Sequence, residues 1–233
     1  MKRKIYFLII MSFPFLTYGQ ISSEENDIKK YIENVHSFIN YLLDDVDRYS
    51  INELPEDVSV GKILDYIGLN VLLNIKNHQP EIIEYFKKRG IEDDIKNITL
   101  IVIKTYVRQI KNQPLEIKEE IDFLLNFDSL IEYNDDEILV PVRKPYTSED
   151  KLLKYFPIGQ HIRSSEFKTI DYNGTSEVER ISLIAEVVEH LGNGDLVIRI
   201  NNILNPLKIE IEYSINDTIV RNAFRLDLIP KIE

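Results

Sequence analysis

The sequence predicts an α+β protein: an N-terminal bundle of about five helices followed by a small antiparallel β-barrel or sandwich. Three observations predict this fold class. Apolar residues recur every three or four positions from Ser22 to about Asn126, as they do on one face of a helix. Beyond Glu137 the apolar period changes to two, as on a half-buried strand. The residues from Leu191 to Gly194 are typical of a tight hairpin turn.

Local signals place the ends of the expected helices. Ser22 and Glu25 can form a capping box ahead of the first helix. Pro80 suits a first helical position, and Gly90 suits a helix C-terminus. The second helix is broadly apolar, so we expect it to be central. The expected helices cover about 24–47, 60–75, 80–89, 94–110 and 116–127, with a loop over 49–59 that contains Pro55.

The expected strands follow a polar, acidic connection. Pro141 restricts any strand around Val140 and Val142 to the edge of a sheet. The other expected strands cover 181–190, 196–200, 207–213 and 218–228. The predicted organisation is a signal peptide over 1–19, a helical domain over 20–127, a connection over 128–145 and an antiparallel β domain over 146–233.

Composition excludes several classes of function. The net charge of −11 disfavours nucleic acid and anionic membrane surfaces, because both need clustered lysine and arginine. The absence of cysteine excludes disulfides, thiolate nucleophiles, cysteine zinc sites and iron–sulfur clusters. It also excludes a lipoprotein anchor, which needs an acylated cysteine.

The N-terminus resembles a secretory signal peptide. Lys2, Arg3 and Lys4 precede an apolar run that is too short for a comfortable membrane span, and cleavage is expected after Gly19. No later segment is expected to cross a membrane. The expected location is therefore the bacterial periplasm or the exterior.

Two stretches carry resemblances to known families. The residues Gly68 to Asn70, Tyr85 to Ile91, Asp94 and Ile101 to Tyr106 make the stretch over about 52–121 similar to a bacterial family of unknown function. The second helix lacks that family's aromatic residues and its Arg-Asn pair. The resemblance implies an architecture and no mechanism.

The second resemblance is shorter. The run from Ala185 to Arg199 resembles the central hairpin of the flagellar L-ring protein, a β-rich assembly protein without catalytic residues. That family carries an acylated cysteine at its mature start, and this chain has none. The resemblance implies a strand–turn–strand shape.

No recognised catalytic or metal motif is present. The four histidines, His36, His78, His161 and His190, do not share a metal-ligand spacing. The sequence also lacks a nucleophile elbow, a P-loop and a dinucleotide fingerprint. The acidic clusters at 44–47, 92–94 and 134–137 lack the spacing of a calcium loop, and solvated charge or helix capping explains them. We therefore expect no cofactor, no metal site and no catalytic residue.

The candidate binding residues lie near the predicted junction of the two halves. Tyrosine is favoured at protein interfaces, and His161 and Arg163 belong to the polar run that leads into the strands. Packing of one half on the other is the simpler explanation of the tyrosines, and a contact surface is the functional one. The candidates are Tyr146, Tyr155, His161, Arg163 and Tyr172.

These observations predict a non-catalytic binding or envelope-assembly module whose partner is another envelope or secreted protein. One alternative is an extracytoplasmic hydrolase that uses carboxylates in a groove between the halves. Another is an acidic immunity or inhibitor protein that blocks a basic partner.

Overall fold

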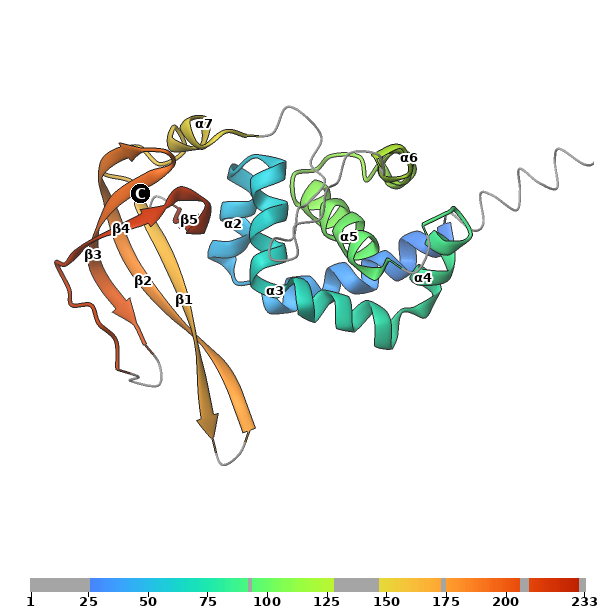
Figure 1. The fold of residues 1–233 in the computed structure, drawn as a ribbon, viewed down its shortest axis with the longest axis horizontal. Helices are drawn as coiled ribbons and strands as arrows, with labels where there is room; N and C mark the ends of the chain where they lie inside the picture. The colour runs from blue at the N-terminus through green and yellow to red at the C-terminus, as the bar shows by residue number, and fades with distance from the viewer. Residues whose placement is uncertain (1–25, 92–93, 128–146, 173–174, 206–209, 231–233) are drawn as a thin grey trace, which may run out of the picture. The chain divides into compact units, whose positions relative to one another are not determined.

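A computed structural model describes residues 26–91, 94–127, 147–172, 175–205 and 210–230 (Figure 1). The expected signal peptide over 1–19 and the expected connection over 128–145 lie outside the described residues. The chain divides into two compact units, neither of which is continuous in sequence. Of the described residues, the first unit contains 26–42, 67–91, 94–105 and 116–127. The second unit contains 43–66, 106–115 and the described residues from 147 onward.

The α+β class is confirmed, but the described residues contain more helices than the five expected. They are a helix over 26–42, α2 (Asp45–Glu53), α3 (Glu56–His78), α4 (Pro80–Lys87), α5 (Ile95–Ile110), α6 (Ile117–Phe127) and α7 (Glu149–Leu153).

The extra helix in the N-terminal part has a local cause. The expected first helix stops at residue 42, because Asp44 and Asp47 form a capping box that starts α2. The Asp47 backbone N–H donates to the Asp44 carboxylate at 2.9 Å, and the Asp44 N–H donates back to Asp47 at 3.0 Å. Most of the expected loop over 49–59 is therefore helical, with a break only around Pro55.

The first unit has a helical core. Ile28, Ile32, Val35 and Ile39 form the buried stripe of the helix over 26–42, and Ile82 and Phe86 are buried on α4. The Gly90 φ of +88° ends the α4 segment, as its position predicted.

The most fully buried of the described helices is α5, whereas α3, which was expected to be central from its apolar composition, is partly exposed. Every residue of α5 from Ile98 to Arg108 is buried, whereas Leu69 and Leu73 of α3 are 69% and 45% exposed. By length and composition α3 is the one helix among the described residues that could cross a membrane, and core helices of soluble proteins pass the same test.

The second unit contains a five-stranded antiparallel sheet of order β4-β3-β2-β1-β5. The strands are β1 (His161–Tyr172), β2 (Thr175–Gly192), β3 (Asp195–Leu204), β4 (Thr218–Asn222) and β5 (Leu226–Leu228). The hairpin expected between β2 and β3 is present, with positive φ at Gly192, Asn193 and Gly194. The β1–β2 hairpin extends far beyond its neighbours, because β5 pairs only with 162–164 and β3 pairs with β2 from Ser182 onward (Figure 1).

The sheet is open, so the expected closed barrel or two-sheet sandwich is not what the described residues form. The expected strand over 218–228 divides into β4 and β5 around a 3-10 turn at Ala223–Arg225, and the two parts lie on opposite edges of the sheet. The four Cα–Cα steps from Asn222 to Leu226 can span at most about 14 Å, whereas four flat strand spacings would need about 19 Å. The sheet must therefore be strongly coiled.

Two other strand predictions have different outcomes. The described part of the expected strand over 207–213 is not a strand, although Ile211 and Tyr213 still pack beside buried Ile181, Leu183 and Ile200. The alternation of apolar and polar residues over 210–213 therefore reflects burial of the apolar side chains and does not mean that this segment hydrogen-bonds to a neighbouring strand. The expected edge strand around Pro141 lies outside the described residues.

Candidate functional site

The five predicted binding residues have different surroundings. Arg163 is buried on β1, and His161 is exposed at the start of the same strand. Tyr155 is half-buried against the core of the second unit, with the Lys154 ammonium 5.1 Å from its ring centroid. Tyr172 ends β1, and its side chain lies outside what is described, as does the whole of Tyr146. Of the five, Arg163 has the most elaborate environment.

Arg163 lies at the centre of a group of six charged side chains in the second unit. The group draws its members from two helices and three strands. We call it the charge cluster, and it consists of Asp44, Asp47, Lys62, Arg163, Arg180 and Asp227.

The Arg163 guanidinium contacts all three carboxylates of the charge cluster. Its Nη1 donates to Asp44 Oδ2 at 2.5 Å, and its Nη2 donates to Asp47 Oδ1. Its Nε and Nη2 donate to Asp227 Oδ2 at 3.2 and 3.1 Å. The group thus ties α2 to β1 and β5.

The other two cations complete the neutralisation. Arg180 donates to both oxygens of Asp47 at 3.0 and 2.9 Å, which is the bidentate geometry that favours arginine. Lys62 Nζ lies 3.0 Å from Asp227 Oδ1 and donates to the Leu226 carbonyl at 2.7 Å. Three cations therefore face three carboxylates, and the formal charge of the charge cluster is zero.

Burial divides the charge cluster into an interior and a rim. The Asp47, Asp227 and Arg163 side chains are 2%, 1% and 4% exposed. Asp44 and Arg180, at 51% and 25%, form the rim. Buried ions of this kind need partners on all sides, because their desolvation costs several kcal/mol each.

The pKa directions agree with this pairing. Burial alone would raise the pKa of the Asp44 carboxyl, but the Asp47 N–H, Arg163 and Arg180 outweigh it and lower that pKa. Burial lowers the pKa of Lys62, and Asp227 opposes that shift. Burial also raises the pKa of the nearby Tyr66 hydroxyl, so that group stays protonated at neutral pH.

The charge cluster is poorly suited to catalysis. All four carboxylate oxygens of Asp47 and Asp227 accept hydrogen bonds from the chain's own donors. A general base must instead reach a substrate proton at hydrogen-bond distance. We therefore interpret the charge cluster as a structural device that joins helices to sheet.

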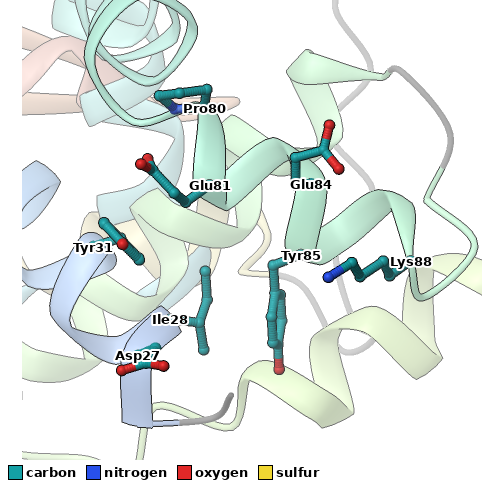
Figure 2. A pocket seen from close by; sticks show the side chains of 8 residues that line it. All are labelled: Asp27, Ile28, Tyr31, Pro80, Glu81, Glu84, Tyr85 and Lys88. Carbon is teal, nitrogen blue, oxygen red and sulfur yellow. The ribbon is translucent and has the colours of Figure 1, made fainter. Parts of the chain in front are cut away.

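A different kind of site lies in the first unit. A pocket of about 310 Å³ opens between the helix over 26–42 and α4 (Figure 2). We call it the α4 pocket, and its lining residues are Asp27, Ile28, Tyr31, Pro80, Glu81, Glu84, Tyr85 and Lys88.

The α4 pocket has an apolar floor and an acidic rim. In Figure 2 the Ile28 side chain lies between the rings of Tyr31 and Tyr85, which come from the two helices. The described part of the lining carries three carboxylates and one ammonium group. The Tyr85 ring already stacks with a guanidinium, since Arg89 Cζ lies 3.5 Å from its centroid.

The carboxylates of the α4 pocket are available to a ligand. Among the described residues, none forms an ion pair or side-chain hydrogen bond with Asp27, Glu81 or Glu84. This contrasts with the charge cluster, where donors occupy the oxygens. Small pockets with an apolar base and a few polar groups are typical ligand sites.

The histidines offer no metal centre in the part of the chain that the structure describes. His36 Nε2 lies 3.0 Å from the Thr105 hydroxyl, and His190 Nε2 lies 2.8 Å from the Phe156 carbonyl. Within those residues no group of three or more His, Asp or Glu side chains could hold a metal ion.

The sequence predictions singled out Arg163 but missed its partners and the α4 pocket. Asp44 and Asp47 did carry a local signal, since their spacing is that of a capping box. Tyr31 with Ile28, and Tyr85 with Glu81, have the spacings that place two side chains on one helix face. No such signal shows which helix faces the other.

Comparison with known proteins adds no relative: no family model, no curated protein and no solved structure matches this chain. The resemblances to the bacterial family of unknown function and to the flagellar L-ring hairpin remain predictions.

Proposed function

We propose that this protein is an exported, non-catalytic binding module that contacts another envelope or secreted protein. The observation that carries the proposal is the α4 pocket, whose three carboxylates have no partner among the described residues. Tyrosine and apolar side chains beside those carboxylates suit a contact surface. The internal neutralisation of the charge cluster supports a non-catalytic role.

Site-directed cross-linking in the native cells tests this proposal. A photoreactive residue at Lys88, on the rim of the α4 pocket, is compared with one at exposed Lys151 on α7. We expect one stoichiometric protein partner from position 88 and none from position 151, identified by mass spectrometry. Turnover in a broad hydrolase screen that is lost on changing one polar residue would refute the non-catalytic role.

Export is tested separately by the mass of the purified chain. A mature N-terminus at Gln20 would agree with the expected signal peptide, and a retained Met1 in the envelope fraction would contradict cleavage after Gly19.

An acidic immunity or inhibitor role is the second candidate, and the net charge of −11 together with the acidic pocket rim favours it. Its association rate with a basic partner should fall steeply with added salt. The hydrolase alternative stays a prediction, and the same hydrolase screen tests it.

A further inference from the structure

We infer that the α4 pocket receives a basic side chain, preferably arginine, presented by the partner protein. The inference rests on the proposed function and names the chemistry of its contact. Nothing in the charge cluster competes for this role, because its carboxylates are already neutralised by the chain's own cations.

Charge determines the sign of the occupant. Asp27 comes from the helix over 26–42, whereas Glu81 and Glu84 come from α4, so acidic groups line the pocket from both helices. These three acidic residues outnumber the nearby cations, which are Lys88 in the lining and Arg89 stacked on Tyr85. A cation is therefore favoured over an anion or a neutral group.

Size and lining determine the kind of cation. The described carboxylates do not converge closely enough to hold a metal ion. A volume of about 310 Å³ is at the lower end for ligand pockets, which range from about 300 to 1,000 Å³. Ile28, Pro80 and the tyrosine rings offer apolar area to an aliphatic stem. The occupant is thus a compact organic cation with an apolar stem.

The tyrosines favour a guanidinium over an ammonium. A guanidinium stacks on an aromatic face and can donate to a carboxylate with two parallel hydrogen bonds. The chain itself demonstrates the first contact, because the Arg89 guanidinium stacks on Tyr85. Tyrosine and arginine are also common anchors at the centre of protein interfaces.

The test is an NMR titration of the isotope-labelled full chain with N-acetyl-arginine methylamide. N-acetyl-citrulline methylamide is the control, since it has nearly the same shape without the charge. We expect saturable shifts confined to 27–31 and 80–88 with the arginine probe, and none with citrulline. Equal shifts with both probes, or shifts spread over other acidic surfaces, would overturn the inference.

Variants that change the charge of the α4 pocket test whether electrostatic attraction determines the affinity for the arginine probe. Glu81→Gln should weaken binding of the arginine probe about fivefold, and Lys88→Gln should strengthen it by a similar factor. Glu33→Gln is the matched control, because Glu33 is exposed on the same helix as Tyr31 and does not line the pocket. A loss for Glu33→Gln equal to that for Glu81→Gln would refute the site.

Failure of this inference and failure of the proposed function give different results. A partner that cross-links at position 88 while the arginine probe does not bind would overturn the inference and leave the proposed function intact. Selective arginine binding without any protein cross-link would refute the protein source and assign the pocket to a free small cation. A cross-linked partner with an arginine at the site of attachment supports both.

Discussion

Replacing Arg163 by methionine is expected to lower the free energy of unfolding of the second unit by about 3 kcal/mol. Breaking a buried ion pair costs about 3–5 kcal/mol, because it leaves an uncompensated charge in the interior. The change removes the donors to Asp44, Asp47 and Asp227 and leaves three carboxylates facing two cations. Arg180 and Lys62 still contact the buried carboxylates, which places the expected cost at the lower end of that range.

Methionine is the right replacement because it preserves much of the apolar stem and so limits the loss of packing. Urea unfolding followed by far-UV circular dichroism measures the effect. With a slope of about 2 kcal/mol per molar, the midpoint should fall by about 1.5 M.

The control is Arg199→Met. Arg199 pairs with Glu186 at 2.7 Å, but its side chain is 47% exposed, so the expected loss is at most about 0.5 kcal/mol. A double-mutant cycle between Arg163→Met and Asp227→Asn should give a coupling energy of about 1–3 kcal/mol. Equal losses for Arg163→Met and Arg199→Met, or additive effects in the cycle, would refute the reasoning.

Three further predictions concern local features. Asp44 has a lowered pKa in the folded state. Its contribution to stability is therefore fully present above its unfolded value of 3.8 and is lost as the pH falls through the folded value. The stability gap between wild type and Asp44→Asn should stay constant from about pH 7 to about pH 5 and narrow below about pH 4, and a gap that stays unchanged in acid would contradict this. Gly90→Ala should lower the free energy of unfolding by about 1 kcal/mol, because the Gly90 φ is +88°. Gly61→Ala lies inside α3 with open space around it, so it should raise the free energy of unfolding by about 0.5–1 kcal/mol. Equal effects of the two changes in thermal unfolding would contradict this argument. Lys104→Met removes the ammonium that lies 3.0 Å from Glu120, whose side chain is 1% exposed, and should lower the free energy of unfolding by about 3–5 kcal/mol. The double variant Lys104→Met/Glu120→Leu should recover most of that loss, because no buried charge is then left unpaired. If urea unfolding shows no such recovery, loss of packing and not loss of the ion pair causes the effect.

Periodic and turn signals anticipated much of the fold. The change from a period of three or four to a period of two separated the helices from the strands, and Gly192-Asn193-Gly194 gave the β2–β3 hairpin. These features depend on neighbouring residues, so they can be read from a short window. The spacing of Asp44 and Asp47 also fits the N-terminus of a new helix, which is where α2 begins.

The errors arose where distant parts of the chain decide the outcome. On average α3 is as apolar as α5, and the packing of the other helices leaves Leu69 and Leu73 exposed. The run over 218–228 contains no glycine or proline that would mark a break, yet its two ends pair at opposite edges of the sheet.

The candidate sites were harder to predict for the same reason. Arg163 lies more than a hundred residues along the chain from Asp44 and Asp47, so nothing local links them. The α4 pocket likewise depends on two helices that are separated by α2 and α3 in the sequence.

The position of Asp227, which follows all of its charged partners in the sequence, bears on the order of folding. It lies on β5, whose last residue is Leu228, and it neutralises Lys62 and Arg163 from much earlier segments. A growing or truncated chain that ends before residue 226 lacks this carboxylate and the Leu226 carbonyl that Lys62 also contacts. The second unit can therefore reach its final state only after residues 226–228 have been made, long after Lys62 and Arg163.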